Sequence, residues 1–332
     1  MIAAPDLDLL ASDVEKDLRA TVRDLLRTRC DAAAVTAMYD SDRSVVEPLW
    51  KALAADLGLA GLMVPEEFGG AGATAREAAA VLDELGRACA PLPFLTSSVI
   101  ATSVLVAGVL AGDSEATRGL LASLASGERT AALVVPFSTA PDAPLAQLSM
   151  REGRISGTVR NVAGAVEADI LLVIVGSDDL AVFAVERDDA EVVPIESLDM
   201  TRQVADISFT GAHGELLLAN GEGAIRDALL TGAALLASEQ AGVARWCLEE
   251  TVAYLKVRKQ FGRVVGGFQA LKHRLADLYA EVDARPRRLG MPRPHWPRAW
   301  TSRSPRGPRP PMPVTWPCMP RRRPSSSTAA LG

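Results

Sequence analysis

The stretch Arg258–His273, RKQFGRVVGGFQALKH, lies between two segments whose apolar residues recur every three or four positions. The first segment runs over 229–247 and the second over 271–282, and this spacing predicts two amphipathic helices. Three glycines interrupt the helical pattern, so a tight loop is expected between the helices. One face of the first predicted helix consists of Leu229, Ala233, Leu236, Gln240, Val243 and Cys247.

The predicted loop carries a cation and two amides beside helix ends. Arg258 falls at the end of the first helix, Gln260 follows it, and Gln269 lies near the start of the second helix. Such groups can form a cradle for a diphosphate. They also fit a structural interpretation, in which Arg258 complements the helix dipole and Gln269 caps a helix. The residues alone leave both interpretations open.

Upstream of these helices, from about 130 to 218, the pattern changes to short β-branched runs separated by turn formers. Short strands with tight turns indicate an antiparallel sheet or small barrel and disfavour alternating strands and helices. The segment 157–169 is expected to be a strand and turn of the same sheet. The five predicted strand runs are 132–135, 170–175, 180–185, 192–195 and 204–209.

Residues 1 to about 128 are expected to be helical. Ser12 and Glu15 have the spacing of a capping box at the start of the first helix. The glycine-rich stretch 59–72 is expected to be a loop. Further helices are predicted over 45–57, 74–88, 96–110 and 114–125.

These patterns predict an α+β chain of several domains. We expect an N-terminal all-α domain over 1–128 and a middle antiparallel β-barrel or sheet domain over 129–220. An incomplete C-terminal helical bundle is expected over 221–285, followed by a basic Pro/Arg-rich tail over 286–332.

The tail differs in composition from everything before it. The net charge of −6 combines −16 over residues 1–285 with +10 over 286–332, and 12 of the 21 prolines lie in that tail. Dense proline without acids predicts disorder. One hypothesis is a basic arm for an acidic partner or nucleic acid, aided by Trp296, Trp300 and Trp316. The preferred hypothesis is a frameshift, because the helical pattern breaks off at Pro286.

Several other classes of protein are disfavoured. The acidic body makes nucleic acid an unlikely main partner. The four cysteines lack metal-ligand spacing and there are only three histidines, so no metal site is expected. The N-terminus lacks an export signal, and 95–111 looks too short and too polar to span a membrane. The expected location is the cytoplasm.

The segment 258–277 resembles the signature of the acyl-CoA dehydrogenases, in the form Arg-x-Gln-Phe-Gly-x-x-x-Gly-x-Phe-Gln-x-x-Lys-His-x-x-Ala-Asp. The stretch 50–72, with PEEFGG at 65–70, is similar to the N-terminal helical domain of that family. The helix–strand–helix order also agrees, and the resemblance spans about residues 10–285.

The resemblance implies FAD-dependent α,β-dehydrogenation of an acyl-CoA thioester, with electrons passed to an electron-transfer flavoprotein. It implies flavin contacts for Arg258, Gln260, Phe268 and Gln269. In such enzymes the Arg-x-Gln segment reaches the FAD of a neighbouring subunit. A homo- or hetero-oligomer with another acyl-CoA dehydrogenase subunit is therefore expected.

The chain departs from the family pattern at several positions. Val134–Ser138 replaces a Thr-Glu-Pro motif that precedes Gly-Ser-Asp, and Asn161–Ala163 replaces Trp-x-Thr. Leu230 and Ala233 replace an Asp-x-x-Arg pair, and Gly232 occupies an alternative position of the catalytic base. No catalytic residue is therefore assigned. Packing or solvent-facing roles are expected for Glu239, Glu249 and Glu250.

Four hypotheses follow. The chain is an acyl-CoA dehydrogenase whose own catalysis is compromised, or the non-catalytic subunit of a hetero-oligomer, or a degenerate interaction protein on the same scaffold, or a misfolded pseudogene product. The acyl group cannot be chosen from the sequence.

Overall fold

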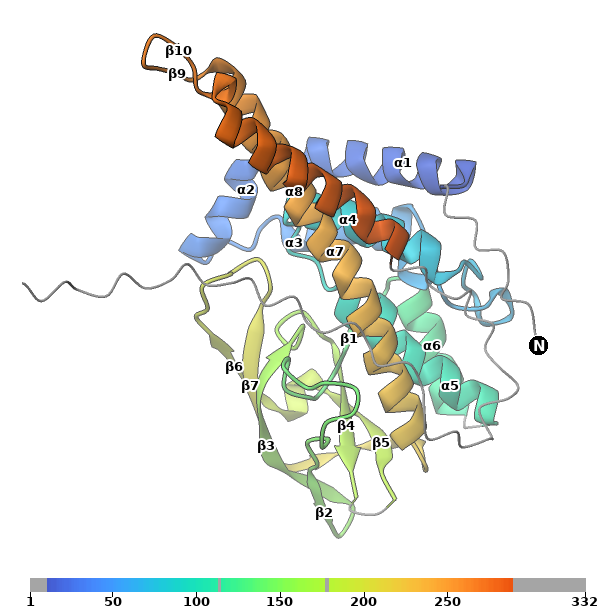
Figure 1. Ribbon diagram of the computed structural model, residues 1–332. Coiled ribbons are helices and arrows are strands. Elements are labelled where there is room, and N and C mark those ends of the chain that lie inside the picture. Colours follow the sequence, from blue (N-terminus) through green and yellow to red (C-terminus); the bar gives the residue numbers. More distant parts are fainter. Residues whose placement is uncertain (1–10, 113–114, 177–178, 289–332) are drawn as a thin grey trace, which may run out of the picture. The chain divides into compact units, whose positions relative to one another are not determined.

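The computed structural model describes residues 11–112, 115–176 and 179–288, with side chains described as far as Asp283 (Figure 1). The first part of the chain is helical, as the sequence predicts. Its elements are α1 (Asp13–Arg29), α2 (Ala32–Ala37), η1 (Met38–Asp40), α3 (Val46–Trp50), η2 (Lys51–Asp56), η3 (Leu59–Gly61), η4 (Glu66–Phe68), α4 (Ala75–Ala88), η5 (Phe94–Ala101), α5 (Thr102–Ala111) and α6 (Glu115–Ala125).

Local capping chemistry sets several of these helix ends. The Glu15 N–H donates to Ser12 Oγ (3.1 Å) and the Ser12 N–H donates to Glu15 Oε2 (2.6 Å), which confirms the predicted capping box. Thr74 and Glu77 form a second capping box at the start of α4. Gly58 ends the η2 turn in a left-handed conformation (φ 68°) that favours glycine. The short helix α2 was not predicted.

Helices η5 and α5 form one continuous apolar segment through the interior. Over Phe94–Ala111 they are 18 residues long, and among the described residues this is the one helix long and apolar enough to cross a membrane. The expectation that the segment is too short and too polar was therefore wrong. Of this segment, 78% is buried inside the fold, as in the core helix of a globular domain.

The middle of the chain forms two four-stranded sheets. One has the order β1 (Ala131–Leu133), β4 (Ile170–Val175), β5 (Ala181–Glu186) and β8 (Glu215–Leu218). The other has the order β2 (Ser149–Arg151), β3 (Arg154–Ala163), β7 (Val204–His213) and β6 (Glu191–Ile195). Each of the five predicted runs contains a strand, whereas β2 and β8 were not predicted. The other strand pairs in these two sheets are antiparallel, as predicted, but β1 pairs with β4 in parallel, which the prediction of an antiparallel sheet did not include.

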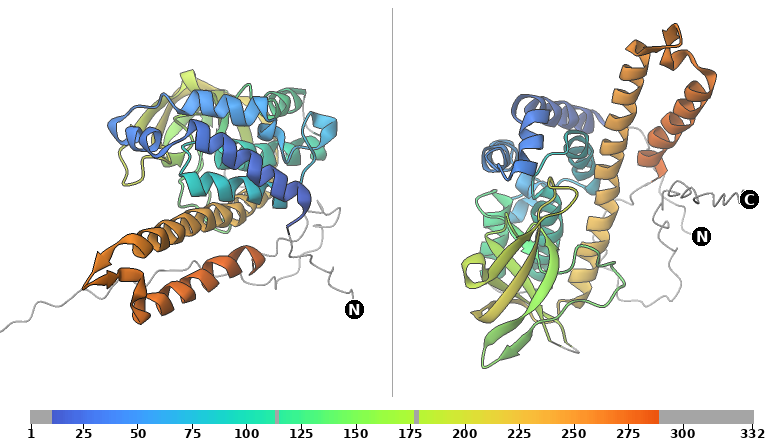
Figure 2. Two further views of the ribbon diagram at one scale, coloured as in Figure 1. Left: turned by 90° about the horizontal axis from the view of Figure 1, so that it is seen from above. Right: turned by 90° about the vertical axis from the view of Figure 1, so that its left-hand side faces the viewer.

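The last part is a helical hairpin of α7 (Glu222–Val257) and α8 (Gln269–Arg288) (Figure 2). Between the helices lie β9 (Lys259–Gln260), β10 (Arg263–Val264) and the turn η7 (Val265–Gly267). α7 packs along α4 at very short range. A Cβ at Gly242 would lie 1.9 Å from the Asp83 carbonyl oxygen, and one at Gly86 would lie 2.0 Å from that of Glu239. Glycine is therefore required on both sides of this contact.

The face of α7 predicted from its spacing is only partly covered in the single chain. Leu229 is buried and Leu236 half-buried, but Ala233, Gln240, Val243 and Cys247 are exposed. The helix contacts α4 through small residues and an arginine, which a search for large apolar residues overlooks. Its buried residues are Ile225, Ala228, Leu229, Gly232, Leu235, Ala241, Gly242 and Leu248.

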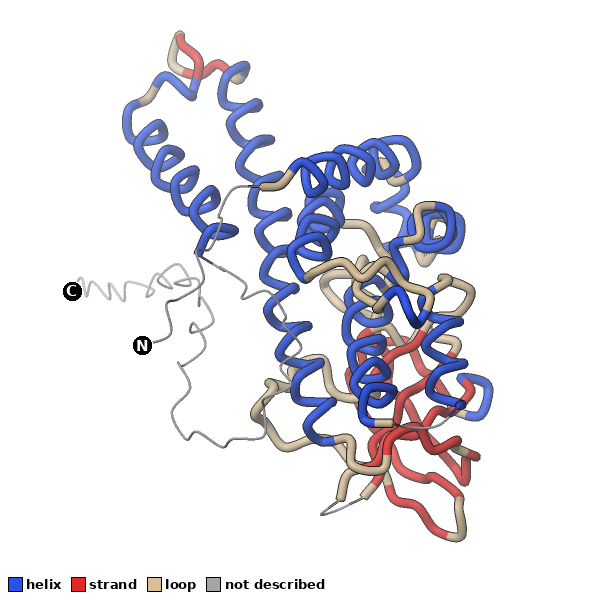
Figure 3. Tube along the Cα trace, turned by 90° about the vertical axis from the view of Figure 1, so that its right-hand side faces the viewer, coloured by secondary structure: helices blue, strands red, loops and turns tan. Residues whose placement is uncertain are grey.

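Helix α8 lies alongside α7 and packs against α7 and η7 (Figure 3). Leu275, Leu278 and Val282 are half-buried, as their spacing predicts, whereas Leu271, on the same predicted face, is exposed. The helix ends at Arg288, three residues beyond the expected limit, so Pro286 lies in its last turn. A proline there removes one backbone hydrogen bond, and the surrounding Ala and Arg residues favour helix. The predictions for the tail beyond Arg288 concern residues outside the described ranges.

Candidate functional site

A small cleft of about 100 Å³ lies where the end of β1 meets η5 and α7. Gly232 allows this approach, because a Cβ there would lie 2.7 Å from Ile100 Cγ1. The wall is mainly apolar and contains no acidic or basic side chain. Residues lining the cleft include Thr96, Ile100, Val135, Phe137, Ala163 and Leu236.

On one side of the cleft, backbone N–H groups of the β domain donate hydrogen bonds to acceptors within the protein. The Phe137 N–H donates to the Asn161 carbonyl (2.7 Å), and the Asn161 N–H donates to Asp206 Oδ1 (2.9 Å). Asn161 has a left-handed backbone (φ 58°), and Pro136 forms a β-bridge with Val162. These amides are therefore committed to the protein's own structure.

A cation–π contact joins this backbone to α7. The Arg202 guanidinium carbon lies 5.6 Å from the centre of the Phe137 ring, and the guanidinium forms an ion pair with Glu239. Glu239, for which a packing or solvent-facing role was expected, thus ties the β6–β7 loop to α7. The sequence did not predict the contact between Arg202 and Phe137, because only the fold brings residues so far apart in sequence together.

The four predicted flavin contacts lie together on the hairpin between α7 and α8. Arg258 is the C-cap of α7 and Gln269 begins α8, and both side chains are exposed. The exposed Gln260 donates through Nε2 to the Lys259 carbonyl (2.9 Å). Phe268 is half-buried beneath the Arg263 guanidinium, whose carbon is 3.9 Å from the ring centre.

The hairpin is held by its own contacts. Phe261 and Phe268 meet edge to face with centroids 6.2 Å apart, and the Val265 N–H donates to the Arg258 carbonyl (2.8 Å). Gly262 (φ 76°) supplies the left-handed conformation that the turn needs. The loop is therefore built to present its polar side chains outward.

The cleft lies beside the first half of α7, and the hairpin follows its C-terminal end. Between Ala233 at the cleft and Arg258 the helix rises by about 37 Å, at roughly 1.5 Å per residue. FAD is too short to span this separation. One flavin therefore cannot contact both groups of residues within a single chain.

The fit to FAD differs between the two places. The hairpin offers an exposed guanidinium and two amides, donors that suit a diphosphate. The cleft is small and mainly apolar, and the Phe137 amide beside it is already hydrogen-bonded. The hairpin thus fits the phosphate part of the cofactor, whereas the cleft alone does not form an isoalloxazine site.

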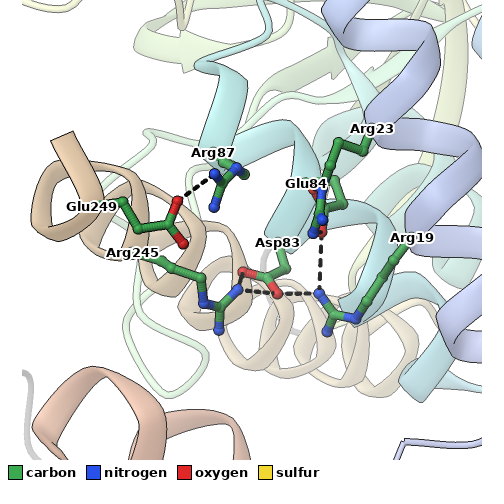
Figure 4. A network of polar contacts seen from close by, with 7 residues as sticks. All are labelled: Arg19, Arg23, Asp83, Glu84, Arg87, Arg245 and Glu249. Carbon is green, nitrogen blue, oxygen red and sulfur yellow. Dashed lines mark hydrogen bonds and ion pairs between the residues drawn. The ribbon is translucent and has the colours of Figure 1, made fainter. Parts of the chain in front are cut away.

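A polar network joins α1, α4 and α7 away from the cleft (Figure 4). Asp83 accepts from Arg245 Nη1 (2.6 Å) and pairs with Arg19, and Glu84 Oε1 accepts from Arg23 Nη2 (2.7 Å). Asp83 and Glu84 are only 3% and 1% exposed.

Glu249 belongs to the same network and pairs with Arg87. The hydrogen bond from Arg87 holds the pKa of Glu249 below its usual value. This residue therefore acts as a structural ion-pair partner, in keeping with the packing role expected for it.

Comparison with known proteins gives one family. The acyl-CoA dehydrogenase N-terminal domain matches residues 12–128 and the acyl-CoA dehydrogenase C-terminal domain matches residues 219–289. Acyl-CoA dehydrogenase IpdE2 of Mycobacterium tuberculosis is 37% identical over 267 residues, which cover 80% of this chain and 71% of that protein.

Solved structures agree with the sequence comparison. The ChsE4–ChsE5 complex from Mycobacterium tuberculosis has a TM-score of 0.73 at 26% identity, over 85% of this chain and 78% of that one. The Tcur3481–Tcur3483 steroid ACAD has a TM-score of 0.70 at 28% identity, over 82% of this chain and 74% of that one. Structures with this fold include ones that hold FAD or its reduced form. From its two matched domains, its similarity to IpdE2 and its fold, this chain belongs to the acyl-CoA dehydrogenase family.

Proposed function

We propose that the chain is one subunit of an FAD-dependent acyl-CoA dehydrogenase, which introduces an α,β double bond into an acyl-CoA thioester and passes electrons to an electron-transfer flavoprotein. In this proposal it presents Arg258, Gln260, Phe268 and Gln269 to a flavin held by a partner subunit. The observation that carries the proposal is the separation of about 37 Å along α7 between these residues and the chain's own cleft.

The hairpin residues suit the phosphate part of that cofactor. When bound, FAD supplies a two-electron acceptor. Arg258 can form charge-assisted hydrogen bonds to phosphate oxygens, and Gln260 adds an amide donor. Gln269 begins α8, where free backbone N–H groups favour an anion. Phe268, stacked under Arg263, fixes the base of the loop.

Exposed apolar side chains support assembly with another subunit. They flank the hairpin on the last turns of α7 and on the loop itself, where packing against a partner would bury them. The chain's relatives include two enzymes named for a pair of subunits, ChsE4–ChsE5 and Tcur3481–Tcur3483. The exposed side chains are Trp246, Tyr254, Val257 and Phe261.

The proposal includes an acyl-CoA substrate and a cytoplasmic location. It assigns residues 1–128, 129–220 and 221–285 to the N-terminal helical, middle β and C-terminal helical domains.

Co-expression tests the proposal. The chain is purified alone and together with an acyl-CoA dehydrogenase paralogue encoded beside it, and flavin absorbance per complex is measured. We expect flavin only in the co-expressed complex. Arg258→Ala should weaken flavin binding about 10- to 100-fold through the loss of a charge-assisted hydrogen bond. Lys256→Ala, in the last turn of α7, is the matched control and should retain flavin.

Two outcomes would contradict the proposal. Full flavin loading and acyl-CoA turnover by this chain alone would show that it needs no partner. No flavin in the complex with this paralogue would favour the degenerate interaction protein.

A further inference from the structure

The loop between β1 and β2 closes one side of the small cleft, and Phe137 of this loop lies at the rim. Its ring lines the cleft, yet the residue is 48% exposed, so it lies between the cleft and the solvent. The cleft volume of about 100 Å³ is well below the roughly 300–1,000 Å³ of ordinary small-molecule sites. With Phe137 in this place, the cleft is too small for a three-ring isoalloxazine.

Several contacts hold Phe137 at the rim. Its N–H donates to the Asn161 carbonyl (2.7 Å), which fastens the backbone to β3. The Arg202 guanidinium carbon lies 5.6 Å from the ring centre, and Arg202 pairs with Glu239 on α7. The side chains of Arg202 and Glu239 are 20% and 21% exposed, so solvent weakens this ion pair less than it weakens a pair on the surface. The ring is therefore held from the β domain and from α7 together.

The rest of the loop is anchored as well. Arg226, in the second turn of α7, donates through Nη1 to the carbonyls of Pro141 (2.8 Å) and Ala143 (3.1 Å). Two residues further on, Leu145 is buried in the hydrophobic core. These anchors fix the loop beyond its first turn, so Phe137 cannot swing away from the cleft without breaking them.

Hydrogen-bond donors of the cleft wall are also engaged. An isoalloxazine carries carbonyl oxygens and ring nitrogens that accept hydrogen bonds, and burying them without donors is unfavourable. The Thr139 N–H donates to the Pro136 carbonyl (2.8 Å), and the Thr96 hydroxyl donates to that of Pro93 (3.1 Å). Like the Phe137 N–H, these donors of lining residues are satisfied within the protein. The cleft therefore opposes a flavin ring both by its size and by its hydrogen bonding.

We propose that Phe137 is the specificity-determining residue that excludes a flavin ring from the chain's own cleft, and that Arg202 and Glu239 are the residues that position it. That the excluded ligand is a flavin rests on the proposed function, in which a partner subunit holds the flavin. The Phe137 ring itself fills the space between the β domain and α7, and it stacks on a guanidinium as a bound planar ring would. Removal of this one side chain should open the cleft.

Equilibrium dialysis against lumiflavin tests the proposal on the purified single chain. Lumiflavin is the isoalloxazine ring carrying only methyl groups, so it lacks the phosphates that suit the hairpin. The unmodified chain should bind it weakly, and Phe137→Gly should bind it at least about tenfold more tightly, because a flat apolar space is opened. Leu198→Gly, at a residue that is 97% exposed and does not line the cleft, is the matched control and should bind like the unmodified chain.

Further variants locate the bound ring and test the positioning residues. Adding Ala233→Phe to Phe137→Gly refills the cleft from α7, because Ala233 lines it, and should abolish the gained binding. Arg202→Met releases the Phe137 ring and should increase the affinity for lumiflavin about twofold to fivefold. Arg202→Lys keeps a cation for both the ring and Glu239, and should bind as weakly as the unmodified chain.

Equal affinities of the unmodified chain and Phe137→Gly for lumiflavin would overturn the role of Phe137. Phe137→Ala, a milder change at the same half-exposed residue, gives the same comparison if Phe137→Gly lowers the yield of folded chain. Binding that persists in the refilled variant would overturn the assignment to the cleft, and equal gains in Arg202→Met and Arg202→Lys would overturn the positioning role of Arg202. Failure of the proposed function appears separately, as the absence of flavin in the co-expressed complex.

Discussion

The two sides of α7 differ sharply. Towards α4 the helix makes backbone-distance contacts at Gly86 and Gly242 and buries two carboxylates among arginines. Towards the hairpin it carries exposed aromatic residues and contacts its own loop and α8. One helix thus combines a completed internal interface with a surface that is free in the single chain. Stability should depend on the first side, and assembly on the second.

The largest effect is expected at the α4–α7 contact. Gly242→Ala places a Cβ within 1.9 Å of the Asp83 carbonyl oxygen, so the helices must move apart. We expect a loss of about 3 kcal/mol in the free energy of unfolding, measured by urea denaturation.

Gly223→Ala is the control in the same helix, since a Cβ there meets nothing within 4 Å. It should stabilise the chain by about 0.5–1 kcal/mol, because alanine loses less backbone entropy than glycine. Equal effects of the two substitutions would mean that the helices are not held at this distance.

A smaller loss is expected in the polar network beside this contact. Glu84→Leu removes a fully buried acceptor and leaves Arg23 without its partner. Because Arg23 is half-exposed and can turn to solvent, we expect about 2 kcal/mol of destabilisation by urea denaturation. Glu249→Ala, which breaks a more exposed pair, should cost less than about 1 kcal/mol. A larger loss of stability from Glu249→Ala than from Glu84→Leu would contradict the greater contribution expected of the buried pair.

Two other buried acids should give opposite pH dependence. Burial raises the pKa of Glu15, but hydrogen bonds from Arg76 and the Ser12 N–H outweigh it, so the net pKa is lowered. Its stabilising contribution is present above the unfolded value of about 4.3 and is lost as pH falls through the lower folded value.

Burial raises the pKa of Glu167, and the attraction of Arg43 offsets this only in part. Stability should therefore fall as pH rises from about 4.3 through the raised value. Urea unfolding from pH 3 to 7 checks this. Glu15→Gln should become more destabilising towards high pH and Glu167→Gln more favourable. If stability changed with pH in the same direction in both variants, the opposite directions of the two pKa shifts would be contradicted.

The sequence predicted best what depends on neighbours in the chain. Ser12 and Glu15 are three residues apart, so their capping box needs only local geometry. The side of α7 that meets α4 was not predicted, because this contact uses Gly242 and Arg245 rather than large apolar residues. The Arg202–Phe137 contact and the Arg43–Glu167 ion pair depend on long-range packing that no short pattern records. The hairpin residues were grouped correctly, and their proposed role depends on a second chain.

The smallest effect on stability, and the clearest on assembly, is expected at the hairpin. Phe261 is 91% exposed, so Phe261→Ser should change the free energy of unfolding of the single chain by less than about 0.5 kcal/mol. In the co-expressed complex the same substitution should lower the yield of flavin-loaded assembly, measured by size-exclusion chromatography with flavin absorbance. Leu198→Ser, at a residue 97% exposed on the β6–β7 loop, is the matched control and should leave both quantities unchanged. If Phe261→Ser destabilises the single chain while the assembly is unaffected, the hairpin belongs to the internal fold, and the distinction between the two sides of α7 fails.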